Sequence, residues 1–208
     1  MASLPSRYRS QMLNSISGIK SGNLIGSISK EGHSNLAVFN SVIHLGSNPP
    51  LFGFTLRPTT VERHTYDNIL SEKCFTINHI HEGMIAQAHQ TAAKYDRNTS
   101  EFEEVGLHEK YLEDVKAPFV EESRIKIACK FVNEYLIAEN QVRLIIGEIT
   151  HMFFDESLQE DDGFIDITKA DTIGILGIDG YVKATKLDRF EYAQPDKPVK
   201  SKYGPQKS

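Results

Sequence analysis

Two arginines, a histidine and three threonines lie within nine residues of this 208-residue chain. They follow an apolar segment and lead into a predicted helix, and they are Arg57, Thr59, Thr60, Arg63, His64 and Thr65. A helix start presents backbone N–H groups without intrahelical partners and a partial positive charge, which together favour an anion such as a phosphate. Because apolar strands precede the cluster, the segment predicts a site for a phosphorylated aromatic cofactor.

The two arginines are the leading candidates for phosphate contacts. The planar guanidinium can donate two parallel hydrogen bonds to phosphate oxygens, and both Arg57 and Arg63 flank the predicted helix start. Pairing with surface carboxylates is the alternative role for each. His64 is either a further donor or an exposed residue of the helix surface.

The threonines divide between capping and binding. Thr59-x-x-Glu62 has the form of a capping box, so a helix is predicted over residues 60–71 with the Thr59 hydroxyl occupied at its N-terminus. The hydroxyls that remain free for a ligand are those of Thr60 and Thr65.

Two predicted strands, 35–45 and 51–57, supply the apolar wall on either side of a Pro-Pro turn. On the first strand, a short polar step could satisfy the carbonyl and imide groups of a flat ring, although these side chains could also simply face solvent. The candidates for contact with the ring are Phe39, Asn40 and Ser41, with Thr55 on the second strand.

Other patterns indicate little chemistry. His79-x-His81 has a spacing that can chelate a metal, but no third ligand stands at a telling distance, so no metal is expected. His81, at the predicted strand end, is instead a candidate for the polar rim of the site. The glycines at 174, 177 and 180 do not form a dinucleotide-binding fingerprint, because no helix is predicted after them.

Strands dominate the rest of the chain, and helices are inserted between some of them. Further strands are predicted over residues 23–29, 74–80, 125–131 and 142–154, a last strand or extended arm over 181–192, and a second helix over 84–94. This order favours a mainly β fold, either a barrel or a compact α+β domain. Residues 1–192 are predicted to form a single domain and residues 193–208, rich in Pro, Lys, Gln and Ser, a disordered tail.

Composition limits the possible partners. A net charge of −5 argues against nucleic-acid or membrane-surface binding, and no apolar run is long enough to span a bilayer. The N-terminus lacks the apolar core of a signal peptide, and the two cysteines, Cys74 and Cys129, are expected to be free thiols. A cytoplasmic protein is therefore expected.

Several segments together resemble the flavin reductase-like family, whose fold is the FMN-binding split barrel. The resemblance lies in NLAVFNSVIHLGSNPPLFGF, RPTTVERHTYDNI and CFTINHI, and continues through residues 101–107, 115–118, 125–131, 147–149 and 175–181. It thus covers roughly residues 20–185. The resemblance implies a split β-barrel, a homodimer with FMN near the subunit interface, and NAD(P)H as electron donor for flavin reduction. With that donor, His81 is the candidate for the side of the site where the nicotinamide would bind.

One departure from the family pattern bears on function. Reductases that serve monooxygenases commonly carry small Ser or Thr residues where this chain has Arg57-Pro58. Arginine suits a permanently held FMN better than a flavin that leaves. A non-enzymatic FMN electron carrier, reduced by a redox protein partner, is therefore the alternative to a NAD(P)H-dependent flavin reductase. A third possibility is a pure binding module, since split barrels also hold haem or nothing.

Overall fold

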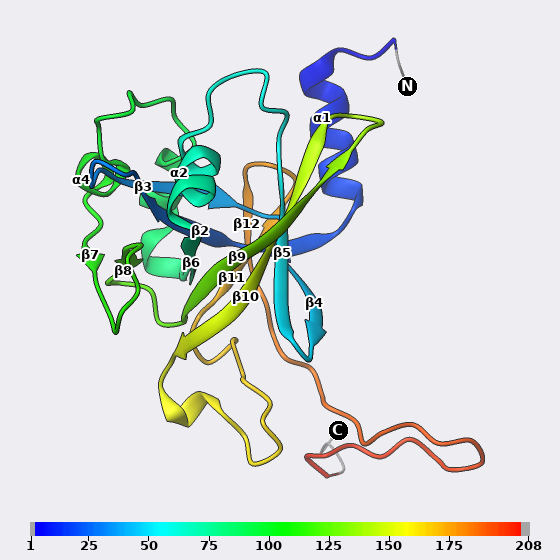
Figure 1. Cartoon of the computed structure of the whole chain (residues 1–208). Coiled ribbons are helices and arrows are strands. Elements are labelled where there is room, and N and C mark those ends of the chain that lie inside the picture. The colour runs from blue at the N-terminus through cyan, green and yellow to red at the C-terminus, as the bar shows by residue number, and fades with distance from the viewer. Residues whose placement is uncertain (1–2, 205–208) are drawn as a thin grey trace.

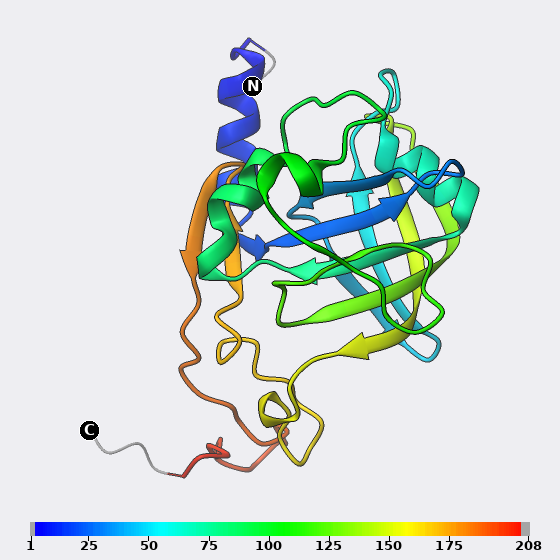
Figure 2. The same ribbon diagram turned by 90° about the vertical axis from the view of Figure 1, so that its left-hand side faces the viewer.

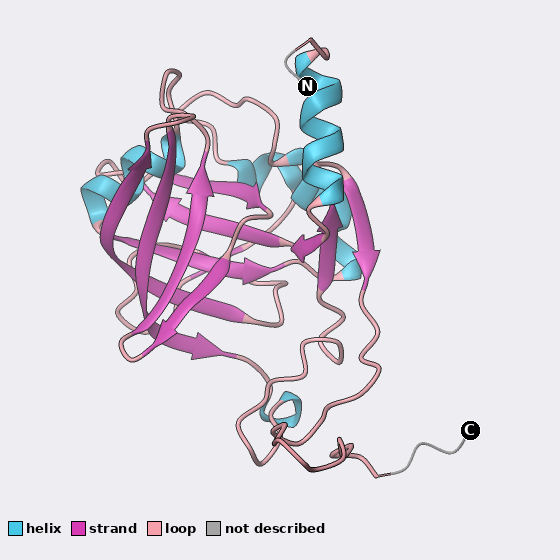
Figure 3. Ribbon diagram, turned by 90° about the vertical axis from the view of Figure 1, so that its right-hand side faces the viewer, coloured by secondary structure: helices cyan, strands magenta, loops and turns pink. Residues whose placement is uncertain are grey.

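A seven-stranded antiparallel sheet forms the body of the protein in the computed structural model, which describes residues 3–204. The strand order is β3-β2-β6-β9-β10-β5-β4, so β3 and β4 form the two edges (Figures 1 and 3). Its strands are β2 (Asn23–Ile28), β3 (Ser34–Phe39), β4 (Ile43–Ser47), β5 (Pro50–Leu56), β6 (Cys74–His79), β9 (Lys126–Ile137) and β10 (Val142–Phe153). The mainly β fold with inserted helices is as predicted.

Two smaller sheets and short helices surround this body. One small sheet joins β1 (Ile19–Ser21), β11 (Ile173–Leu176) and β12 (Gly180–Lys183), and the other pairs β7 (Glu109–Lys110) with β8 (Phe119–Val120). The helices are α1 (Ser6–Ile16), η1 (Glu82–Met84), α2 (His64–Glu72), α3 (Ile85–Gln90), α4 (Glu101–Val105) and η2 (Glu156–Leu158). Figure 2 shows that α1, which the sequence analysis did not predict, projects beyond the sheets, and none of its residues is buried. Among residues 3–204, no helix is long and apolar enough to cross a membrane.

Aromatic contacts hold the centre of the sheet together. Phe54 is fully buried and meets Phe39 and Phe75 edge-on, at centroid distances of 5.0 and 5.5 Å. Burial of such a side chain contributes about 1.5–3 kcal/mol. Gly147 lies at a register shift between β9 and β10, and a Cβ there would lie 2.5 Å from the Phe75 ring. The glycine therefore allows the ring to pack directly against the strand.

The predicted strand over residues 35–45 is wrong in one respect, because it divides into two. β3 ends at Phe39, and β4 begins at Ile43 on the opposite edge of the sheet. In the break, Ser41 Oγ donates to the Thr55 carbonyl at 3.0 Å and accepts from the Thr55 N–H at 3.1 Å. The Ser41 side chain thus replaces the hydrogen bonds that a neighbouring strand would make to Thr55. The chain can therefore cross here from edge strand β3 to edge strand β4.

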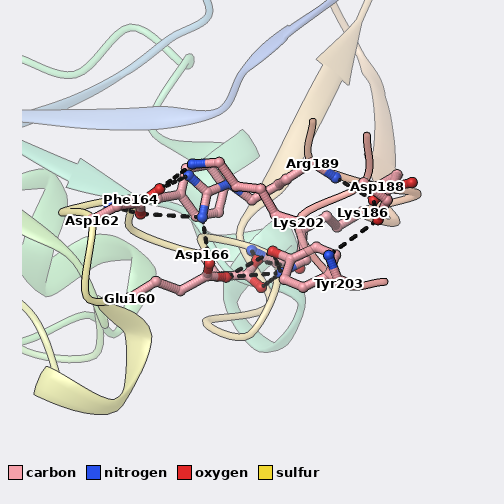
Figure 4. A network of polar contacts seen from close by, with 11 residues as sticks. Glu160, Asp162, Phe164, Asp166, Lys186, Asp188, Arg189, Lys202 and Tyr203 are labelled. Carbon is pink, nitrogen blue, oxygen red and sulfur yellow. Dashed lines mark hydrogen bonds and ion pairs between the residues drawn. The ribbon is translucent and has the colours of Figure 1, made fainter. Parts of the chain in front are cut away.

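The last described residues, up to 204, return to the loop that follows β10. From residue 184 the chain runs away from the sheets, and it turns back so that the Glu191 N–H donates to the Lys200 carbonyl at 2.9 Å (Figures 1 and 2). A cluster of charges, which we name the C-terminal clasp, joins the two segments (Figure 4). It consists of Glu160, Asp162 and Asp166 with Lys186, Arg189, Lys202 and Tyr203.

The sequence predicts a disordered tail over residues 193–208, and that stays a prediction; in the structure, residues of this segment contact the loop after β10. Lys202 pairs with Asp162, and the Tyr203 hydroxyl donates to Glu160 at 2.8 Å. Residues 205–208 lie outside the described part of the chain.

Candidate functional site

A groove of about 670 Å³ lies where the ends of β3 and β5 meet the start of α2. The far wall comes from the segment after α3 and from the β11–β12 hairpin. Of the ten predicted cofactor-binding residues, eight line this groove: Phe39, Asn40, Ser41, Thr55, Arg57, Arg63, His64 and Thr65. The structure therefore places most of the residues that the sequence predicts to bind a cofactor around one groove.

The start of α2 differs from the prediction in a way that favours an anion site. The helix begins at His64 with Arg63 at its N-cap, so the predicted helix start at residue 60 is wrong. Thr59 and Thr60 lie in a turn and do not line the groove. No side chain caps the helix, because Arg63 carries no acceptor for the first N–H groups. The first turn therefore keeps open donors at the groove wall.

Three cationic side chains that line the groove lack carboxylate partners among the described residues. The Arg63 Nε atom is buried and has no hydrogen-bond partner. Arg57 is exposed directly after β5, and Lys94 lies across the groove. Among the residues that the structure describes, none of the three forms an ion pair. A buried donor without an acceptor costs about 1–3 kcal/mol, which a bound anion would relieve.

Acidic residues near the groove are occupied elsewhere. Glu62 pairs with Arg97 at 2.7 Å and lies 3.8 Å from the His64 ring. Glu101, in α4, accepts from the Leu36 N–H at 2.9 Å, and burial raises the pKa of its carboxyl. The groove therefore holds two carboxylates that are already hydrogen-bonded and arginines that are not.

The polar side chains predicted to contact the ring are partly engaged in hydrogen bonds that hold the wall in shape. Ser41 is held by Thr55, as described above, and the Asn40 amide donates to the Gly177 carbonyl at 3.0 Å. Thr65 is buried, and its hydroxyl oxygen accepts from Asn35 at 3.0 Å, which leaves its hydrogen free to donate. Backbone groups, the Thr65 hydroxyl and the Asn40 amide oxygen are therefore the polar contacts that this wall can offer.

The far wall was missed by sequence reasoning. It includes Lys94, Tyr95, Ile178 and Tyr181, and the Tyr181 hydroxyl lies 2.9 Å from the His89 ring nitrogen. Tyr181 ends one of the segments that carry the family resemblance, which is a signal that could have identified it. Ile178 lies in the same segment, whereas Lys94 and Tyr95 reach the groove only through long-range packing, which no local pattern encodes.

His81, the candidate for the nicotinamide side, is not among the residues that line the groove. Its ring nitrogen accepts from the Gly83 N–H at 3.1 Å and so caps η1. His79 on β6 has its pKa lowered to about 4 by burial. Within residues 3–204, no group of three or more metal-binding side chains occurs, and Cys74 and Cys129 are free thiols as predicted.

Comparison with known proteins establishes the family. Residues 17–169 match the flavin reductase like domain, so the chain belongs to the flavin reductase-like family, as the resemblance predicted. A solved structure from Shewanella frigidimarina, provisionally described as a flavin reductase with a split barrel domain, is 46% identical. It superposes with a TM-score of 0.88 over 92% of this chain and 96% of that one. The fold is therefore the split barrel, as predicted.

More distant structures share the fold. Nitrilotriacetate monooxygenase component B from Bacillus cereus is 23% identical, with a TM-score of 0.81 over 90% of this chain and 95% of that one. Flavoredoxin of Desulfovibrio vulgaris is 24% identical, with a TM-score of 0.70 over 86% of this chain and 91% of that one. One fold thus carries proteins described as an oxygenase component and as a flavoredoxin, so the fold alone does not decide the reaction.

Proposed function

We propose that the groove binds FMN and that the protein is an oxidoreductase that reduces flavin at the expense of NAD(P)H. The observation that carries this proposal is the buried Arg63 Nε, which lacks an acceptor beside a helix start that no side chain caps. A terminal phosphate would supply acceptors to both. The Arg63 guanidinium and the backbone N–H groups at the start of α2 therefore fit the phosphate of FMN better than they fit its uncharged ring.

Each wall of the groove has a separate task in this proposal. Arg63, Arg57 and the first turn of α2 would hold the phosphate, and Thr65 would donate a further hydrogen bond. The break between β3 and β4, held by Ser41, would present backbone groups and an apolar surface to the ring. When bound, FMN supplies a ring that accepts a hydride; the protein supplies position and excludes water.

The nicotinamide would bind without a dinucleotide-binding fold. The sequence has no glycine fingerprint for dinucleotide binding. The protein would therefore bind the nicotinamide only by leaving one face of the flavin ring accessible in the groove. A weak, short-lived complex and a high KM for NAD(P)H are expected. No titratable side chain need be essential, and His81→Ala should change activity little because His81 does not line the groove.

We further propose a homodimer in the cytoplasm. Apolar side chains on the projecting β9 strand, among them Val132, Tyr135 and Leu136, are about half exposed, with values of 49, 58 and 48%. A second copy would cover them. The two free thiols suit a reducing compartment. Light scattering at micromolar concentration tests the dimer, and a mass of 23.4 kDa would contradict it.

A non-enzymatic electron carrier is the second candidate. Arg57 and Arg63 both line the groove, and two arginines favour an FMN that stays bound. Electrons would then arrive from a redox protein partner in place of NAD(P)H.

Two measurements test these proposals. Denaturation of the purified protein should release FMN on chromatography; FAD, haem or no chromophore after FMN soaking would refute the cofactor. Anaerobic mixing of the holoprotein with excess NADH or NADPH should then bleach the flavin. If neither nucleotide bleaches it and a reduced protein donor does, the electron-carrier function replaces the reductase.

A further inference from the structure

A second hollow of about 570 Å³ lies at the other end of the barrel from the flavin groove. The two cavities share no lining residue. Val142, at the start of β10, lines the groove, whereas Phe153, at its end, lines the hollow. Eleven residue steps along a strand span about 35 Å, so the hollow is a separate place on the subunit.

Basic side chains dominate this hollow, which we name the basic hollow. Four cations line it, Lys110, Arg124, Lys126 and Lys169, with Asp155 as the single carboxylate. The chain as a whole carries a net charge of −5, so this local excess of positive charge runs against the composition. Asp155 accepts from the Ser157 N–H at 2.8 Å. It forms no ion pair with any residue that the structure describes.

Two of the four cations have carboxylate partners and two do not. Arg124 pairs with Asp171 at 2.5 Å, and Lys110 lies 3.4 Å from Glu121. Lys126 and Lys169 form no ion pair within residues 3–204.

Lys126 is the more constrained of the unpaired cations. The residue is half-buried, and its ammonium group donates to the Ser123 carbonyl. Burial lowers the pKa of Lys126 and the charge of Lys110 lowers it further, while the nearby carboxylates of Glu121 and Glu122 offset part of this shift. An anion in the hollow would offset the cost of burying the Lys126 ammonium group, which has no ion-pair partner among the described residues.

Aromatic and apolar side chains also line the basic hollow, and Phe153 on β10 lies directly across the ladder from Lys126 on β9. Phe153 meets Phe119 edge-on at a centroid distance of 5.4 Å and stacks on the His151 ring at 6.0 Å with an interplanar angle of 13°. Phe154 packs against a small core cluster around Leu158. These rings are held in place by their neighbours, so a flat ligand would meet a rigid wall.

We propose that the basic hollow is a second ligand site, distinct from the flavin groove, which binds a small aromatic anion. Lys126 and Lys169 bind the charged group, and Phe153 and Phe154 contact the flat apolar body. A carboxylate and a phosphate both satisfy the charge, and the aromatic wall selects a ligand that carries a ring over the bare ion.

Equilibrium dialysis against FMN-saturated protein tests this site, because saturation leaves the flavin groove closed to the probe. Salicylate is the aromatic carboxylate, and inorganic phosphate is the anion without a ring. We expect salicylate to bind with roughly tenfold or greater preference over phosphate, and Lys126→Met or Lys169→Met to weaken salicylate binding about five- to tenfold each. Lys130→Met is the matched control, since Lys130 is exposed on the same strand and does not line the hollow.

The outcomes separate clearly. No salicylate binding, or equal loss in Lys130→Met and Lys126→Met, would overturn the site. Equal affinity for phosphate and salicylate would overturn the aromatic selection. Melting curves of each variant distinguish a lost contact from a lost fold, and FMN content, which should stay unchanged, keeps this result separate from the flavin proposal.

Discussion

The flavin groove and the C-terminal clasp both concentrate arginine and lysine, yet they treat these cations in opposite ways. In the clasp, Arg189 pairs with both Glu160 and Asp162, and Lys186 pairs with Glu160 and Asp166 (Figure 4). In the groove, Arg63 keeps a buried Nε without any acceptor. The same residue types are thus saturated in one region and unsatisfied in the other.

This difference separates structural charge from recognition. A paired network joins two chain segments and offers little to a ligand, because its cations already have carboxylate partners. An unsatisfied donor beside an uncapped helix costs stability in the free protein and is repaid when an anion binds. The basic hollow lies between these cases, with two cations paired and two unpaired.

The largest expected effect is on the groove. Arg63→Ala should weaken FMN binding by about 1.5–3 kcal/mol, the range for hydrogen bonds to a charged group. The FMN-free variant should melt at no lower a temperature than the unaltered protein, since the substitution breaks no ion pair among the described residues and removes the buried, unpaired Nε. Fluorescence titration with FMN measures the first effect, and Arg63→Lys, which keeps the charge without the fork, is the control. An unchanged dissociation constant would place Arg63 outside the site.

Acid should weaken the barrel before it opens the clasp. Burial lowers the pKa of His79 from 6.5 to about 4, so the unfolded chain takes up a proton in this interval and the folded chain does not. Stability is therefore lost as pH falls from about 6.5 to 4. We expect a loss of about 2 kcal/mol, less than the full shift implies because the residue keeps some exposure.

Urea unfolding at several pH values measures this loss, and His79→Gln should flatten it. The clasp should persist through the same interval. Hydrogen bonds from Arg189 and Lys202 hold the pKa of the Asp162 carboxyl below its usual value of 3.8, so its contribution is lost only at lower pH. A profile that is equally steep in His79→Gln would show that other groups carry the acid sensitivity.

Arg57→Ala should have a smaller effect than the Arg63 variant. Arg57 is exposed at the end of β5, and contacts of exposed charges are screened by water and salt. We expect FMN binding to weaken by about 0.5–1 kcal/mol, and the loss to shrink as salt is added. A loss equal to that of Arg63→Ala, independent of salt, would mean that bound FMN buries this guanidinium.

The smallest expected effect on the site comes from the clasp. Arg189→Ala should leave the FMN dissociation constant unchanged, because Arg189 does not line the groove. Hydrogen exchange should become faster in residues 184–204 and in the loop at 160–166, which the clasp joins. Weaker FMN binding in this variant would contradict the separation of the two regions.

Sequence patterns predicted much of the groove because its near wall is local in the chain. Residues 39–41 and 55–65 lie close in sequence, and hydrophobic periodicity with a strand-to-helix transition places them together. The helix start was predicted at residue 60, because Thr59 and Glu62 have the spacing of a capping box. In the structure Arg63 takes the N-cap position, and Glu62 pairs with Arg97 from a distant segment.

The far wall and the clasp could not be predicted in this way. Lys94 and Tyr181 reach the groove through packing of α3 and β12, and Lys202 meets Asp162 across forty residues of chain. The tail composition favours disorder, and only the spatial position of the acidic loop supplies its partners. Long-range pairing of charges is set by the fold and leaves no periodic signal.

Comparison of FMN with riboflavin tests the central claim most directly, because the two ligands differ only in the phosphate. Titration of the apoprotein should show FMN binding far more tightly than riboflavin, by at least about 1.5–3 kcal/mol for the Arg63 contact alone. In Arg63→Ala this difference should shrink by the same amount, and riboflavin affinity should stay unchanged. Equal affinity for the two ligands in the unaltered protein would contradict phosphate anchoring at the start of α2.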